Sequence, residues 1–322
     1  MGAVLGPVLA QGVIARRPGM VTLAARVDAD RRAVRTVQRL RDRHGPGPVR
    51  LRIPGRRVTL LLSAEDVHRM LVESPEPFAP ANLEKRGALG HFQPHGVLIS
   101  HGRARAERRR FTEAVLDTGR PLHRFAERIT AVVGEEAALL ADEAAVSGVL
   151  DWDNVIRSWW RIVRRVVLGD PARDDHETTD MLRTLRQRAN WSYLRRPDPD
   201  LRERFLERLR SYVTAASPGS LAALVAQTPA PAGLGPDGRM PLDPVGQVPQ
   251  WLFAFEPAGM AAHRALALVV AHRGTDVGTQ IDAEVRSADL ATPQDLPLLR
   301  ASVLESVRLW PTTPVVLRDT TA

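Results

Sequence analysis

The side chains with the clearest capacity for chemistry in this 322-residue chain are arginines and their acidic neighbours. Arg105 and Arg109 are four residues apart, so on a helix their guanidinium groups lie on one face and can converge on an anion. Glu305 and Arg308 are three residues apart and can form an ion pair on a second helix. An exposed basic helix face or a solvated ion pair has the same spacing, so neither pattern alone identifies a site.

A proline and a glycine interrupt the long apolar stretch Trp251–Ala271. Pro257 has no N–H to donate to the preceding turn, so it bends or breaks a helix. Gly259 lacks a side chain and lets a flat ligand approach the backbone closely. Taken alone, the segment also fits a core helix that bends around its neighbours. This simpler interpretation is favoured over a ligand-facing helix.

Cysteine is absent from the chain, and its absence removes many kinds of site. Without thiols there can be no disulfide framework, no thiolate zinc site, no iron–sulfur cluster and no cysteine nucleophile. The hydrophobic content of 44% excludes a wholly disordered chain and is sufficient for a large buried core.

Positive charge is abundant, with a formal net charge of +8, and nearly all of it is arginine because Lys85 is the only lysine. A basic balance can indicate nucleic-acid binding, for which the stretch Arg103–Arg110 is the candidate. Acidic residues are interspersed with the arginines along the whole chain, which favours a mixed surface instead. We therefore expect no nucleic-acid partner, and steeply salt-dependent binding to any duplex would contradict this.

Alternating apolar residues predict one β-hairpin near the start of the chain. Helical spacing over the first forty-odd residues ends at Gly45–Pro48. The period then changes to two, which predicts strands over Val49–Ile53 and Val58–Leu62 that turn at Pro54-Gly55.

The rest of the chain is predicted to be helical, apart from two irregular segments. Prolines break the pattern in Pro75–Ser100, and Pro229–Pro249 is a long loop with a turn at Pro236–Gly238. The predicted helices are a short one capped by Ser63 and running through Leu71, one from about Gly102, and Arg124–Ala145, Trp152–Leu168, Thr178–Tyr193, Leu201–Ala215, Trp251–Ala271 and Leu298–Leu309. We expect residues 1–322 to form a single domain, because the last long apolar helix needs partners to bury its surface.

Taken together and in this order, the motifs resemble the cytochrome P-450 family of haem-thiolate monooxygenases. The family's first motif is a glycine-led helix with an arginine seven residues later, here Gly102 and Arg109. The second is a small-residue motif on a long helix across the haem face, here Ala258-Gly259.

The third motif of the family is a Glu-x-x-Arg helix, here Glu305 and Arg308. A strand that carries a further arginine follows it, and Arg318 matches that position. The resemblance extends over nearly the whole chain from about Gly47. It implies a cytochrome P-450-like fold, mainly α with a small β region.

The resemblance also implies roles for particular residues. Those expected to bind the haem propionates are Arg105, Arg109 and Arg318. Those expected to line the oxygen-binding face are Ala258, Gly259 and Ala262. Those expected to lock the core are Glu305 and Arg308, as a buried structural pair in which loss of one partner would strand a charge. The segment expected to contribute to the substrate pocket is Pro75–Ser100.

The chain departs from the family at the iron ligand. The family holds its iron through a cysteine well after the Glu-x-x-Arg helix, whereas this chain has no cysteine and ends at Ala322. We therefore expect a chain that is incomplete at its C-terminus, lacks the haem-ligand loop and is inactive alone. A histidine ligand is the alternative, and the candidates are His91, His95, His101 and His263.

Two further departures concern proton transfer and haem binding. Ala261 and Ala262 stand where the family has an acid and a threonine that relay protons, and neither side chain can donate a hydrogen bond. Glu256 and His263 are the nearby groups that can replace them. Arg105 stands where the family usually has an aromatic residue or a histidine, and it still suits a carboxylate partner.

The resemblance implies a haem-dependent monooxygenase, an oxidoreductase that inserts one oxygen atom of O2 into a small organic substrate. Its electrons would come from a ferredoxin or a flavoprotein. Met1–Ala15 lacks the charged start of a secretory signal and no apolar run spans a bilayer, so we expect a cytoplasmic monomer without a membrane anchor. The alternative is a non-catalytic helical binding protein that has lost the haem.

Overall fold

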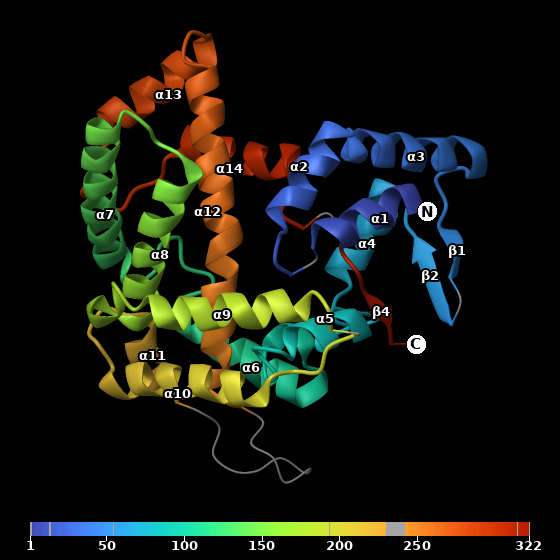
Figure 1. The fold of residues 1–322 in the computed structure, drawn as a ribbon, viewed down its shortest axis with the longest axis horizontal. Coiled ribbons are helices and arrows are strands. Elements are labelled where there is room, and N and C mark those ends of the chain that lie inside the picture. The colour runs from blue at the N-terminus through green and yellow to red at the C-terminus, as the bar shows by residue number, and fades with distance from the viewer. Residues whose placement is uncertain are drawn as a thin grey trace. The chain divides into compact units, whose positions relative to one another are not determined.

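The computed structural model describes residues 2–12, 14–53, 55–192, 194–229, 242–313 and 315–321. Helices dominate the described chain and strands are few, as the apolar spacing predicts (Figure 1). The predicted turn at Pro236–Gly238 lies outside the described residues, as does Pro54 in the hairpin turn. No helix among the described residues is both long enough and apolar enough to cross a bilayer.

The chain divides into two compact units. The smaller unit comprises residues 1–91, 186–197 and 313–322, and the larger comprises residues 92–185 and 198–312. A single domain over residues 1–322 stays a prediction.

The smaller unit contains five helices and two small sheets among its described residues. Its elements are α1 (Gly2–Gln11), α2 (Pro18–Arg26), α3 (Ala29–His44), β1 (Val49–Ile53), β2 (Arg56–Leu60), α4 (Ala64–Val72), β3 (Phe78–Ala79), α5 (Leu83–Leu89) and β4 (Asp319–Thr320). Helix α1 contacts both α2 and α3, and β3 pairs with β4.

Strands β1 and β2 form the predicted antiparallel hairpin. Val49 lies opposite Leu60, and Leu51 lies opposite Val58. Side chains of β1 alternate between half-buried and exposed, which is the period of two that the sequence predicts. The second strand ends at Leu60 rather than at Leu62.

The segment Pro75–Ser100 is not irregular throughout, contrary to the prediction from its prolines. Helix α5 forms within it because Asn82 caps the first turn, accepting a hydrogen bond from the Lys85 N–H to its side-chain oxygen at 2.8 Å. Strand β3 also lies in this segment and pairs with β4 from the end of the chain.

The described part of the larger unit contains helices and no strands. Its elements are η1 (Val97–Ile99), α6 (Gly102–Val115), α7 (Ala126–Ser147), α8 (Trp152–Leu168), η2 (Asp170–Ala172), α9 (His176–Ala189, whose last turn belongs to the smaller unit), α10 (Pro199–Ala215), α11 (Leu221–Gln227), η3 (Val245–Gln247), α12 (Val248–Ala271), α13 (Asp276–Ser287) and α14 (Pro297–Leu309). Within this unit α12 contacts α8, α13 and α14 (Figure 1).

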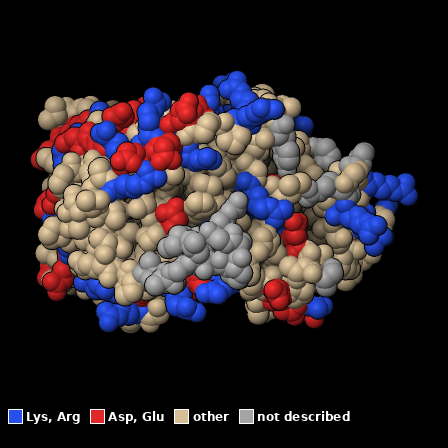
Figure 2. All heavy atoms as spheres, turned by 90° about the horizontal axis from the view of Figure 1, so that it is seen from below, with Lys and Arg blue, Asp and Glu red and all other residues tan. Residues whose placement is uncertain are grey.

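Ion pairs join α7 to α8 and to the segment after it. Glu136 of α7 is fully buried and accepts hydrogen bonds from Arg165 at 3.0 Å and from Arg173 at 2.6 Å. Arg164 is also buried and donates to the carbonyl of Ala172 at 3.1 Å. Figure 2 likewise shows basic and acidic side chains next to one another along much of the face in view. Part of the arginine charge is thus neutralised within the fold.

Candidate functional site

Helix α12 forms the centre of the candidate site. It begins at Val248, three residues before the predicted start at Trp251, and ends at Ala271 as predicted. Pro257 lies inside it and cannot donate to the carbonyl of Phe253 one turn earlier. The helix nevertheless continues across the proline to Ala271.

Trp159 of α8 occupies the space that Gly259 leaves open. A Cβ added to Gly259 would lie 2.8 Å from both Cδ1 and Nε1 of the Trp159 indole. The same indole N–H donates a hydrogen bond to the carbonyl of Phe255 at 2.8 Å. The flat group beside Gly259 in the structure is thus a tryptophan of the chain itself, which fits the favoured interpretation of a core helix. The expectation that Gly259 lines an oxygen-binding face stays a prediction.

The other small residues of α12 divide into two faces. Ala261 is buried and its carbonyl accepts a hydrogen bond from the Ser306 hydroxyl of α14 at 2.9 Å. Ala254 and Ala258 are exposed and Ala262 is half-buried, so these three form a row of small side chains along the helix, four residues apart. We call these three residues the alanine row.

Glu256 and His263, the groups proposed to replace the missing proton relay, are both half-buried on α12. The His263 ring lies 5.4 Å from the ring of Trp152 between centroids, with the planes tilted by 59°. Its Nδ1 atom is buried and has no hydrogen-bond partner among the described residues. A role for either residue in proton transfer stays a prediction.

The two candidate arginines of α6 differ in exposure. Arg109 is exposed and pairs with Glu113 on its own helix, Nε to Oε1 at 2.6 Å. Arg105 is half-buried, one turn earlier on the same helix. The helix that should present them is therefore formed, whereas their convergence on one anion stays a prediction.

Arg318, the third candidate, is half-buried in the smaller unit, next to β4. Burial lowers the pKa of its guanidinium. Lys85 of α5 lies close by: its Nζ atom donates to the Leu317 carbonyl at 3.1 Å, to which Arg318 also donates at 3.0 Å. Burial and the charge of Arg318 together lower the pKa of Lys85 to about 8.

Sequence reasoning missed Lys85 as a candidate site residue. The signal that could have found it is its uniqueness, since it is the only lysine in a chain rich in arginine. A lysine loses its proton more readily than an arginine when it is buried next to another cation.

The prediction that Glu305 and Arg308 form a buried pair is wrong. They do pair, with Arg308 Nε 2.7 Å from Glu305 Oε2. However, the side chain of Arg308 is 69% exposed and that of Glu305 is 46% exposed. The residue of α14 that faces α12 is Ser306, which is fully buried. Successive helical residues point about 100° apart, so a helix that buries Ser306 turns Glu305 to its side and Arg308 to nearly the opposite face.

The donor groups of the described residues do not fit a haem-thiolate iron. The chain has no cysteine, and no three His, Cys, Asp or Glu side chains cluster as a metal site within the described residues. No three of the four candidate histidines lie together among the described residues. They are His91 (buried), His95 (2.8 Å from Asp243), His101 (exposed) and His263 (half-buried).

Neither a scan against models of protein families nor a search of curated proteins gives a match. Solved structures do match in fold. A zebrafish cytochrome P-450 with progesterone matches with a TM-score of 0.62 and 16% identity, over 87% of this chain and 71% of that one. CYP102L1 matches with a TM-score of 0.59 and 18% identity, over 88% and 71%. Retinoic acid-bound cyanobacterial CYP120A1 matches with a TM-score of 0.55 and 17% identity, over 85% and 64%.

The chain therefore has the cytochrome P-450 fold, mainly helical with a small β region. The prediction of fold class from the three motifs is confirmed. At identities of 16–18%, the likeness establishes the fold alone.

We expect Gly259→Ala to destabilise the protein by about 1 kcal/mol. The added methyl group would meet the Trp159 indole, and overpacking of this kind costs about 1–3 kcal/mol, partly offset by alanine's higher helix propensity. Urea unfolding measures the change, with Ala258→Ser on the exposed face as the control. In a Trp159→Leu background the same substitution should become neutral or stabilising, and an undiminished loss there would refute this account.

We expect Glu305→Ala to leave the melting temperature unchanged, because the pair is exposed and water replaces the missing partner. Ser306→Leu on the same helix should instead lower stability by about 1–3 kcal/mol, since it forces a large side chain against α12. Thermal unfolding of the two variants side by side checks both. A larger loss from Glu305→Ala than from Ser306→Leu would restore the buried-pair interpretation.

We expect Lys85 to titrate with a pKa of about 8. Its reaction with acetic anhydride should therefore be half-maximal near pH 8, because only the neutral amine is nucleophilic. Peptide mapping by mass spectrometry separates Lys85 from the α-amino group. Arg318→Gln removes one cause of the shift, so the pKa should rise toward its ordinary value. An unchanged midpoint in that variant would show that the two cations do not interact.

Proposed function

We propose that the chain supplies the distal helix and substrate-facing region of a cytochrome P-450-type monooxygenase, an oxidoreductase that incorporates one oxygen atom of O2. The observation that carries this proposal is the alanine row of α12 in a chain with this fold. Ala254 and Ala258 are exposed on the helix that the resemblance places across the haem face. Side chains this small leave room for a flat cofactor and a bound substrate above it.

The proposed haem contacts come from three arginines and one lysine. Arg105, Arg109 and Arg318 would bind the propionates, and Lys85 adds a second cation beside Arg318. A haem group would supply oxygen-activation chemistry when bound. A haem-thiolate enzyme would need a cysteine from outside these 322 residues, so we do not assign activity to them alone.

The environment of α12 bears on proton supply. Ala261 and Ala262 have no hydrogen-bond donors in their side chains, so neither can deliver a proton. His263, half-buried with a buried Nδ1 atom, and Glu256 are groups of the same helix that can take up and release a proton near neutral pH. We propose that one of these residues, or a substrate hydroxyl, provides the proton.

An apolar organic molecule is the substrate class we propose. Structures of the same fold were solved with progesterone and with retinoic acid, both largely apolar. We further propose a ferredoxin or flavoprotein as the electron donor, and a monomeric, cytoplasmic protein. The segment Pro75–Ser100, with α5 inside it, would contribute to the substrate pocket.

A non-catalytic helical binding protein is the second candidate function. The absence of cysteine favours it, since the fold is present and the thiolate is not. The two functions differ in whether the candidate arginines hold haem.

We expect the 322-residue chain to bind added haemin without thiolate ligation. The reduced, carbon monoxide-bound spectrum should therefore lack the red-shifted Soret band of a thiolate complex, because no cysteine can donate the fifth ligand. Arg318→Gln and Arg105→Gln should weaken haemin binding, measured by absorbance titration. Arg26→Gln, which removes an exposed arginine of α2, is the charge-matched control.

Two outcomes would contradict this. A thiolate-type spectrum would overturn the ligand argument. Equal haemin affinity in Arg318→Gln, Arg105→Gln and Arg26→Gln would remove the proposed propionate contacts and favour the non-catalytic binding protein.

A further inference from the structure

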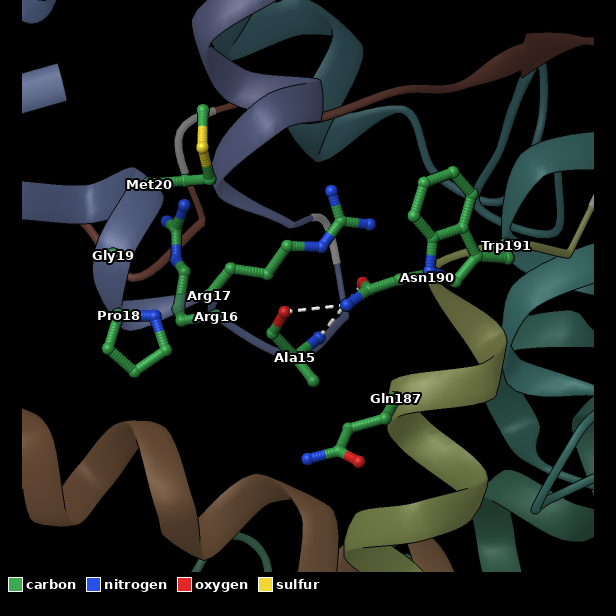
Figure 3. Close-up of a pocket in the computed structure, with 9 residues that line it drawn as sticks. All are labelled: Ala15, Arg16, Arg17, Pro18, Gly19, Met20, Gln187, Asn190 and Trp191. Atoms are coloured by element: carbon green, nitrogen blue, oxygen red, sulfur yellow. Dashed lines mark hydrogen bonds between the residues drawn. The ribbon is translucent and has the colours of Figure 1, made fainter. Parts of the chain in front are cut away.

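The smaller unit has an open hollow of about 430 Å³, which we call the cavity, between the start of α2 and the end of α9 with the two residues that follow it (Figure 3). Its size falls within the range of small-molecule sites. The residues that line it are Ala15, Arg16, Arg17, Pro18, Gly19, Met20, Gln187, Asn190 and Trp191. All of them belong to the smaller unit, and none takes part in the proposed haem contacts.

One wall of this cavity is fixed by Asn190. Its side-chain oxygen accepts hydrogen bonds from the N–H groups of Ile14 at 2.9 Å and Ala15 at 3.1 Å, and its NH2 donates to the Ala15 carbonyl at 2.7 Å (Figure 3). Gly12, with φ of +90°, allows the tight turn that places the Ala15 carbonyl there. The backbone that carries Arg16 and Arg17 is therefore held in place without a ligand, which reduces the ordering cost of binding.

The cavity is cationic and partly aromatic. Arg16 and Arg17 line it, and no Asp or Glu is among its described lining residues. The Arg17 guanidinium lies 4.6 Å from the ring centroid of Trp191, and its Nη1 atom donates to the Ala10 carbonyl at 3.2 Å. Trp191 is 45% exposed, so part of its ring can still receive a ligand.

These features select a class of ligand. A guanidinium has five N–H donors in a planar fork, so the one bond from Arg17 to Ala10 leaves donors that suit a carboxylate. An exposed indole edge and Met20 offer apolar surface to a flat body. Gln187 adds an amide that can donate or accept at the rim.

We propose that this cavity binds a small organic anion, a carboxylate attached to an aromatic or other flat apolar body. The carboxylate pairs with Arg17 and Arg16, and the flat body lies against Trp191 and Met20. The stack of Arg17 on Trp191 holds the guanidinium in position for this pairing. The proposal does not depend on haem and is separate from the proposed function.

The test is calorimetric titration of the 322-residue chain with 2-naphthoate, and with neutral 2-naphthalenemethanol of the same shape. We expect naphthoate to bind at least tenfold more tightly than the alcohol. Arg17→Gln and Trp191→Leu should each weaken naphthoate binding at least fivefold. Arg17→Lys, which keeps the charge but loses the planar fork, should weaken it less than Arg17→Gln. Arg26→Gln lowers the net charge equally outside the cavity and should change the affinity less than twofold.

Because Arg17 also bonds to Ala10, circular dichroism and thermal unfolding first establish that each variant is folded. Trp191→Leu leaves that bond in place and so tests the site independently. Equal affinity for naphthoate and the alcohol would overturn the proposal, as would equal losses in Arg17→Gln and Arg26→Gln. Unchanged naphthoate binding in both Arg17→Gln and Trp191→Leu would also overturn it, since the anion would then bind elsewhere.

Discussion

The contact between Trp159 and α12 determines how the candidate site is built. The indole fills the space where Gly259 has no side chain and donates to the Phe255 carbonyl, so one residue supplies both close packing and a directional bond. Both interactions fix the rotation of α12 about its own axis. Turning the Gly259 face toward α8 leaves Ala254 and Ala258 exposed, which is what makes the alanine row available to a ligand. A larger residue at position 259 would rotate or displace that row.

The second contact of α12 shows how small residues, not charges, position the helices of the larger unit. Ser306 is buried against α12 and bonds to the Ala261 carbonyl, while the Glu305–Arg308 pair beside it stays in water. Buried charges lie elsewhere, and those of the Glu136 cluster join α7 and α8. There each carboxylate oxygen has a guanidinium partner, which offsets the desolvation of both groups. The contact between α7 and α8 therefore rests on ion pairs. The contacts of α12 with α8 and α14 rest on alanine, glycine and serine.

The sequence predicted most of the fold because the fold depends on local periodicity. Alternation predicted the β1–β2 hairpin, with the second strand two residues too late, and helical spacing predicted α12 to within three residues at its start. Helix α5 was missed because prolines around it obscured the cap at Asn82. The burial of Glu305 and Arg308 could not be read from their spacing, since spacing places both on one face without saying which face packs. The lowered pKa of Lys85 depends on its burial and on Arg318, which is far away in the sequence, so neither cause could be read before folding.

In a chain with 45 basic residues and a net charge of +8, the number of arginines says little about function, and their partners say more. Arg165 and Arg173 meet buried Glu136, and Arg109 meets Glu113 one turn along its helix. These cations have an internal role that accounts for them. The cavity beside Trp191 differs in its lining: two arginines lie on a backbone held by Asn190, and no acid is among its described lining residues. Two guanidinium groups on one wall attract an anion more strongly than the same charges interspersed with acids. The position of Arg16 and Arg17 is therefore more informative about a ligand than the basic composition.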